Sequence, residues 1–91
     1  MEVTIMDYVI FKQWLQDEKN MSVRSATDVV SRCKRINRMI EENDINDKTG
    51  SMLIEMKSYD NMSSSIKSQL KRAITLHLEF SKEAKNYKRN N

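Results

Sequence analysis

The feature that most constrains this chain is its near lack of residues that break helices. Its 91 residues include no proline and a single glycine, Gly50. Tight turns between β-strands depend on glycine and proline, which supply positive or fixed φ angles, whereas both residues interrupt helices. The composition therefore favours helices joined by short polar loops over a turn-rich β architecture. We predict an all-α protein.

The length of the chain allows one domain with a modest core. We expect residues 1–87 to form this domain, and residues 88–91 to be a frayed tail or the start of a linker. Apolar residues recur at helical spacing in four segments separated by "KNMS", "NDIND" and "DNMS", which have the usual length of helix connections. We predict helices at residues 4–18, 23–42, 48–59 and 64–86.

Each predicted helix has one apolar side, and these sides together form the predicted core. A tryptophan on the first helix is assigned to the core rather than to an exposed contact. The predicted core residues are Tyr8, Phe11, Trp14, Leu15, Ala26, Val29, Val30, Cys33, Ile36, Ile40, Met52, Leu53, Met56, Ile66, Leu70, Ala73, His77, Phe80 and Ala84.

The triplet "NMS" occurs twice, and each copy precedes a long segment of mixed apolar and basic residues. A serine hydroxyl can accept a hydrogen bond from an unpaired N–H in the first turn, so Ser22 and either Ser63 or Ser64 are expected N-caps. Met21 and Met62 stand just before these caps, where an apolar side chain can pack on the first turn. The triplet also matches the glycosylation pattern, which has no use in the cytoplasmic protein expected here.

The net charge is only +3, from 16 basic and 13 acidic residues, and by itself it does not indicate nucleic acid. The distribution along the chain is more informative. Acidic residues gather in "QDEKN" and "EENDIND", whereas basic residues follow each "NMS" triplet and recur in "KNYKRNN". The second and fourth predicted helices therefore carry most of the positive charge.

On the second predicted helix the polar residues lie opposite the apolar stripe, and further cations flank them. On the fourth predicted helix polar residues gather on the outer faces of the N-terminal half. These patterns fit either a solvated helix face or an electrostatic footprint for phosphates. The residues concerned are Arg24, Ser31, Arg32, Lys34, Arg35 and Arg38 on the second helix, and Lys67, Ser68, Lys71, Arg72 and Thr75 on the fourth.

The sequence offers no set of residues suited to catalysis. His77, the single histidine, falls on an apolar stripe and has no partner base, metal partner or nucleophile at suitable spacing. Cys33, the single cysteine, excludes an intrachain disulfide and a cysteine-based zinc site. There is also no glycine-rich phosphate loop. We expect no enzymatic activity, cofactor, metal or small-molecule substrate for this chain.

The sequence also argues against a membrane protein. No apolar run approaches the roughly 20 residues of a membrane span. The first residues include Glu2 and Asp7 instead of a basic stretch followed by an apolar one. We expect a soluble cytoplasmic protein without a membrane partner.

The order of these features resembles a known family. An "F-x-x-W-L" helix precedes "EKNMSVRSATDVVSRCKRI", an acidic loop leads to a short third helix, and "SSSIKSQLKRAITLHLEF" follows. The pattern resembles the core-binding N-terminal domain of tyrosine recombinases, the phage-integrase family, from about residue 8 to residue 83. The family places an aromatic residue where this chain has His77. The positions that carry the resemblance are Ser22, Ser25, Val29, Ile36, Ser65, Ile66, Leu70, Ala73, Leu76, His77 and Phe80.

The resemblance implies a compact four-helix orthogonal bundle of the SAM-like type that packs on duplex DNA. It implies that the second and fourth helices face the major groove at a recombination core site, and it adds Ser65 to the residues expected at DNA. In this family an arginine–histidine–tyrosine set on a separate C-terminal domain performs the chemistry. We therefore expect the chain to be a fragment of a longer recombinase, with the catalytic domain of the same parent chain as its partner.

Two alternatives stay open at the level of sequence. The chain could bind DNA as a stand-alone protein without recombinase activity. It could instead be a small helical protein-interaction module, with Tyr8, Ile10 and Trp14 of the first helix as contact residues.

Overall fold

The structure is a computed structural model. It describes the backbone of residues 2–42 and 45–89, and the side chains of residues 8–42 and 45–83. All regular secondary structure in this part of the chain is helical, which confirms the predicted all-α class. The helices are α1 (Glu2–Glu18), α2 (Val23–Ile40), α3 (Thr49–Ile54), α4 (Lys57–Asp60) and α5 (Ser64–Arg89).

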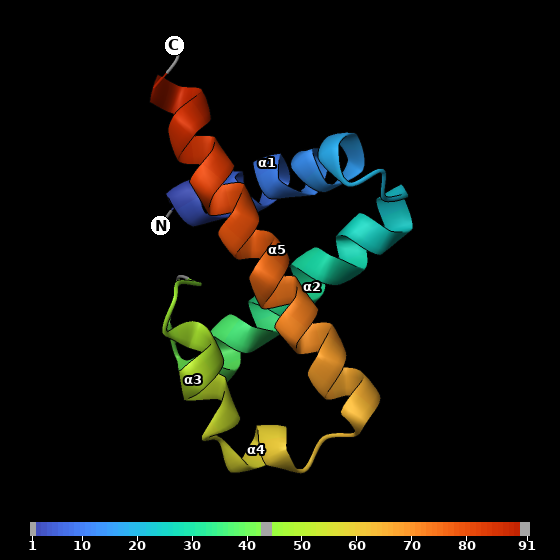
Figure 1. Ribbon diagram of the computed structural model, residues 1–91, viewed down its shortest axis with the longest axis vertical. Coiled ribbons are helices and arrows are strands. Elements are labelled where there is room, and N and C mark those ends of the chain that lie inside the picture. Colours follow the sequence, from blue (N-terminus) through green and yellow to red (C-terminus); the bar gives the residue numbers. More distant parts are fainter. Residues whose placement is uncertain (1, 43–44, 90–91) are drawn as a thin grey trace.

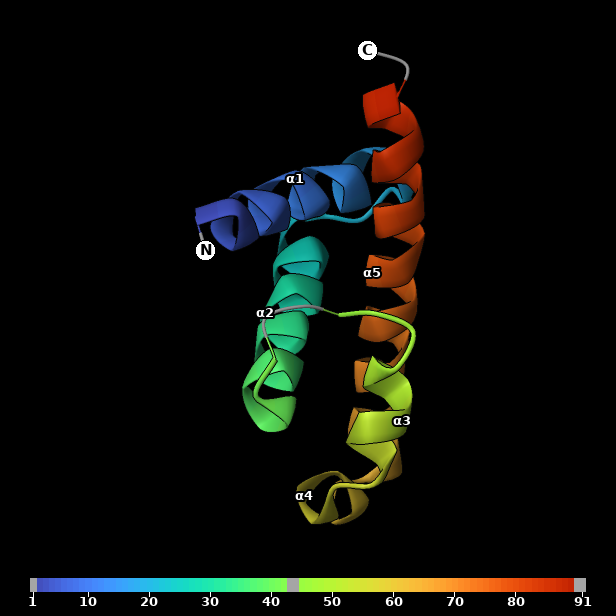
Figure 2. The same ribbon diagram turned by 90° about the vertical axis from the view of Figure 1, so that its left-hand side faces the viewer.

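The longest helix, α5, organises the arrangement (Figure 1). It crosses α2, and the two helices lie side by side in two layers when the molecule is turned by 90° (Figure 2). Helix α1 lies across one end of this pair and contacts both members, whereas α3 packs on both from the other end. The core therefore lies where α1, α2 and α5 meet, with α3 closing its lower side.

The prediction of a single helix at residues 48–59 is wrong, because this segment forms two short helices. Met56 adopts an extended conformation, with φ −84° and ψ 135°, and separates α3 from α4. In an unbroken helix, Leu53 and Tyr59 would project about 120° apart, because six residues turn the helix by about 600°. The break allows both side chains to be buried.

Two further expectations need correction. Met52, predicted to point inward, is 38% exposed, because α3 buries Thr49 and Leu53 instead. Helix α2 ends at Ile40 rather than at residue 42, since Glu41 takes the left-handed conformation and its N–H donates to the carbonyl of Asn37.

The predicted core is otherwise present where its side chains are described. Phe11, Leu15, Ile36 and Leu70 are among its least exposed members. Trp14, Ile40, Met56 and Ile66 are half-buried and pack against it, and Ala84 lies outside the described side chains. Buried residues that the pattern did not identify are Ile45, Thr49, Tyr59, Ile74 and Leu76.

Both serine caps form as predicted, with Ser63 rather than Ser64 at the second. The Ser25 N–H donates to Ser22 Oγ at 3.1 Å, and the Ile66 N–H donates to Ser63 Oγ at 3.3 Å. Met21 and Met62 pack against the core beside them. The repeated triplet thus begins the two helices that cross at the centre of the fold.

Helix α5 continues to Arg89, past the predicted end at residue 86, and residues 90–91 of the expected tail lie outside the described part. Among the described residues, no helix combines the length and the apolar character needed to cross a bilayer.

We predict that Ser22→Ala and Ser63→Ala each lower the free energy of unfolding by about 1 kcal/mol, because each leaves a first-turn N–H without its acceptor. Urea denaturation followed by circular dichroism measures the change. Ser51→Ala, at an exposed position inside α3, is the matched control and should change stability by less than about 0.5 kcal/mol. An equal effect in all three variants would show that the caps contribute nothing specific.

Candidate nucleic-acid interface

Helix α2 separates its apolar and basic residues on opposite sides. It buries one stripe of five residues against α1 and α5, so the residues opposite that stripe are left to solvent. The helix carries five basic residues and one acidic residue, Asp28. Four of the predicted site residues are exposed along the side away from the core: Arg24, Ser31, Arg35 and Arg38.

The first half of α5 shows the same separation. Residues 64–75 include three basic residues and no acidic residue. Leu70, Ala73 and Ile74 are buried in this half, and the polar side chains between them face outward. The exposed members of the predicted site are Ser65, Ser68, Lys71, Arg72 and Thr75.

Two lysines of the predicted site instead lie over aromatic rings of the molecule. Lys34 Nζ lies 5.6 Å from the ring centroid of Tyr8 on α1. Lys67 Nζ lies 5.5 Å from the ring centroid of Tyr59 and 3.9 Å from Asp60 Oδ1. A cation over an aromatic face is attracted by the ring quadrupole. These two lysines therefore lie at the α1 and α4 borders, away from the crossing of α2 and α5.

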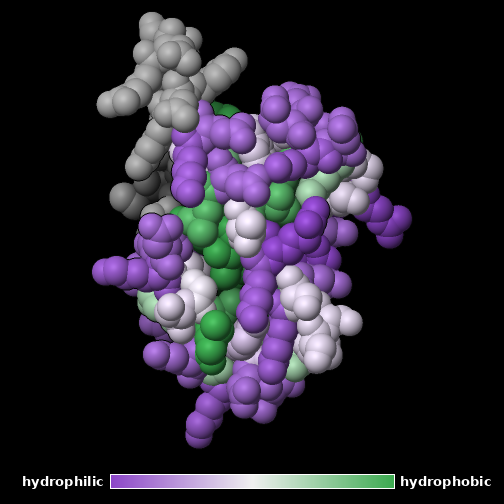
Figure 3. Space-filling model, viewed as in Figure 1, coloured by the Kyte–Doolittle hydropathy of each residue, from purple (hydrophilic) through white to green (hydrophobic). Residues whose placement is uncertain are grey.

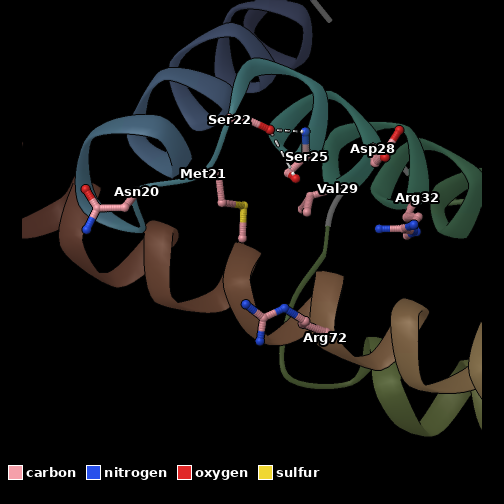
Figure 4. A pocket seen from close by; sticks show the side chains of 8 residues that line it. All are labelled: Asn20, Met21, Ser22, Ser25, Asp28, Val29, Arg32 and Arg72. Atoms are coloured by element: carbon pink, nitrogen blue, oxygen red, sulfur yellow. Dashed lines mark hydrogen bonds between the residues drawn. The ribbon is translucent and has the colours of Figure 1, made fainter.

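Arg32 and Arg72 are the predicted site residues that the fold brings to one place. They line a hollow of about 450 Å³ between α2, α5 and the loop that precedes α2 (Figure 4). Arg32 enters from α2, and Arg72 lies along α5 beneath Met21. The full lining is Asn20, Met21, Ser22, Ser25, Asp28, Val29, Arg32 and Arg72.

Helical spacing extends this border in both directions. Arg35 follows Arg32 by three residues, and Ser68 and Ser65 precede Arg72 by four and seven residues, so each lies on the same side of its helix. We call Arg32, Arg35, Ser65, Ser68 and Arg72 the α2–α5 edge. All except half-buried Arg32 are exposed. A single rigid ligand could contact both helices along this edge.

The arginines of this surface keep their charge available. In the described part of the chain the ion pairs join Lys19 to Glu79 and Lys67 to Asp60, so no arginine is neutralised by a carboxylate within 4.0 Å. A guanidinium stays charged at any physiological pH and presents a planar fork of donors that suits phosphate oxygens. The arrangement can bind anions, and above all phosphates.

The surface is polar rather than apolar. Hydrophilic residues cover most of the face that carries α5, and only a narrow strip of apolar residues runs through it (Figure 3). The large exposed apolar side chains are spread over α1, α2 and α3: Val9, Ile10, Val23, Met52 and Ile54. The described residues thus offer no broad apolar patch on this face for docking another protein.

The contact residues of the protein-interaction alternative are mostly unavailable. Tyr8 is 8% exposed. Trp14 is half-buried, as its assignment to the core predicted, and its Nε1–H donates to Glu83 Oε1 at 3.0 Å. Only Ile10 is fully on the surface, at 52% exposure.

His77 and Cys33 lie in the core, as their spacing predicted. The His77 ring makes edge contacts with Tyr8, Phe11 and Phe80, and it is 8% exposed. Burial raises the pKa of the Cys33 thiol to about 12, and its Sγ–H donates to the Ala73 carbonyl at 3.7 Å. Within the described residues no three His, Cys, Asp or Glu side chains gather as metal ligands would.

Comparison with models of protein families, with curated proteins and with solved structures gives no match for this chain. Its function is therefore inferred from its residues and their placement. The strongest signal is the set of unpaired arginines at the crossing of α2 and α5. The spacing of residues along each helix predicted the exposed cations, but it did not identify the hollow, because Asn20, Met21 and Ser22 enter it from a loop.

We predict that Cys33 reacts with iodoacetamide at pH 8 only when the protein unfolds, and therefore far more slowly than a free thiol. The thiolate is the reactive form, and a pKa of about 12 leaves almost none of it at this pH. Mass spectrometry of timed samples measures the modified fraction. The same protein in concentrated urea is the control and should react at the rate of a free thiol. An equally fast reaction without urea would contradict the burial of Cys33.

Proposed function

We propose that this chain is a duplex-DNA-binding module of the kind that tyrosine recombinases use to grip the core recombination site. The observation that carries the proposal is the set of arginines without a carboxylate partner on α2 and the first half of α5, among which Arg32 and Arg72 line one hollow. Neutralising backbone phosphates supplies most of the affinity of non-specific DNA binding. The arginines of the α2–α5 edge supply positive charges that can neutralise such phosphates.

The fold supports this proposal in its general plan. Helices α1, α2 and α5 follow three of the four predicted segments, and α3 with α4 replaces the remaining one. We propose that this is the SAM-like orthogonal bundle of core-binding domains, with α4 as an added turn. Because α2 and α5 cross, both helices would then face the DNA. The major groove is about 12 Å wide and about 8.5 Å deep, so it can admit one α-helix.

The proposed role is binding and positioning, not chemistry. His77 and Cys33, the two residues most often used as base and nucleophile, are held in the core. Strand transfer would depend on the catalytic domain of the same parent chain. Linking two weak DNA-binding domains raises the effective concentration of each at the site, so the module alone need not bind tightly.

The first test is an amide-shift titration of the labelled protein with a duplex of about 20 base pairs, close to two turns of B-DNA. We expect shifts at α2 and the first half of α5 that fade as salt is added, because phosphate contacts release counterions. Shifts confined to α1 and α3, or none at low salt, would instead favour the protein-interaction module.

We predict that the double variant Arg35→Gln with Lys71→Gln weakens binding to all duplex sequences. The slope of log Kobs against log salt should fall by about two, since each lost phosphate contact removes about 0.9 from it. Fluorescence anisotropy over a salt series measures this slope. The matched control is Lys48→Gln with Lys57→Gln, two exposed lysines outside α2 and α5. An equal loss in the control would show that only net charge matters.

A further inference from the structure

The hollow between α2 and α5 contains more than two charges. Val29 and Met21 give it apolar walls, and Figure 4 shows Met21 extending between the two helices. Ser22 and Ser25 supply hydroxyl groups at the start of α2, and Asn20 lies at the rim beside the end of α1 (Figure 4). Its volume of about 450 Å³ equals the share of about fifteen water molecules in the liquid, so a phosphodiester group and several waters fit.

Two guanidiniums line this space without a carboxylate partner within 4.0 Å among the described residues. Like charges that share one cavity repel, and an anion between them converts that repulsion into attraction. Arg32 and Arg72 also come from different helices, so an anion bound by both would bridge α2 and α5.

The hydroxyl groups beside the arginines fit the same ligand. Ser22 Oγ–H donates to Ser25 Oγ at 3.2 Å, which leaves the Ser25 O–H to donate elsewhere (Figure 4). Asn20 stands at the rim in the left-handed conformation, with φ 56°. Hydroxyl donors commonly complete phosphate contacts made by arginine.

Asp28 opposes anion binding. It precedes Arg32 by one helical turn, and in Figure 4 its carboxylate is turned to the side of α2 away from α5. The lining therefore has a net charge of +1, from two arginines and one aspartate. A net positive lining attracts phosphate groups of either kind.

From these observations we propose that the hollow holds one backbone phosphate of the bound duplex, clamped between Arg32 and Arg72. The inference rests on the proposed DNA-binding function and defines one of its contacts. A phosphate clamp fixes the position of both helices on the backbone without reading base sequence. Its loss should therefore weaken binding to all sequences alike.

The test replaces single phosphates of the duplex, one position at a time, by uncharged methylphosphonates. With the unmodified protein, one position should lower affinity by about tenfold, as expected for loss of charge-assisted hydrogen bonds. In the double variant Arg32→Gln with Arg72→Gln, the same replacement should have no further effect. Asp28→Asn should strengthen binding to the unmodified duplex and keep the sensitive position.

The matched control is Arg24→Gln with Arg38→Gln, which removes the same charge from the outward side of α2. This variant should bind more weakly and yet keep the full methylphosphonate effect. Thermal melting of each variant confirms that it is folded. The clamp is overturned if the Arg32/Arg72 variant still binds the duplex and every methylphosphonate that weakens binding of the unmodified protein weakens binding of this variant equally. In that case the DNA-binding function stands.

A parallel titration with inorganic phosphate identifies the source of the anion. Weak shifts of the Arg32 and Arg72 Nε–Hε signals, together with tighter binding of the duplex, support the backbone phosphate. The same shifts without any duplex binding would overturn both the clamp and the DNA-binding function, and would leave a site for a small phosphate compound. Absence of duplex binding and of phosphate shifts would likewise overturn both.

Discussion

The packing of Phe11 between α1 and α5 is the contact on which the rest of the structure depends. Its ring is fully buried and lies 5.1 Å from Phe80 and 4.9 Å from His77, measured between centroids. Trp14 covers the same cluster, at 5.6 Å from Phe80. Aromatic pairs in such tilted and edge arrangements add stability beyond the area they bury. They hold α1 across α5, and α2 buries its apolar stripe against both helices.

Polar contacts around this cluster fix the angle of α1. Lys19 Nζ lies 2.7 Å from Glu79 Oε1 and 5.5 Å from the Trp14 ring centroid, while Trp14 donates to Glu83. At the other end, Asn37 donates to the Tyr8 hydroxyl and so ties α2 to α1. These contacts use the cations and amides nearest α1, so the arginines of α2 and α5 are left for ligands.

The same constraint produces the proposed binding surface. Because α2 packs on both α1 and α5, its buried stripe is broad, and its cations are confined to the outer side and to the two borders. One border meets α1, where Lys34 lies over Tyr8. The other meets α5, where Arg32 and Arg72 line one hollow. A site built between two packed helices keeps its geometry when a ligand binds, so little conformational entropy is lost.

The sequence by itself determined the helical class, the two serine caps and nearly all of the core of α1, α2 and α5, because these depend on local propensity and on spacing along one helix. It also identified most of the exposed cations of α2 and the first half of α5, although Arg32 and Lys67 are half-buried. Only the tertiary structure decided which of them lie together, since the rotation of one helix about its neighbour depends on how their side chains interdigitate. For the same reason, spacing alone missed the break at Met56, which the burial of Tyr59 favours. Spacing also gave no reason to place Arg32 and Arg72 together at one hollow. Nor did it show that Lys34 and Lys67 lie at the borders with α1 and α4.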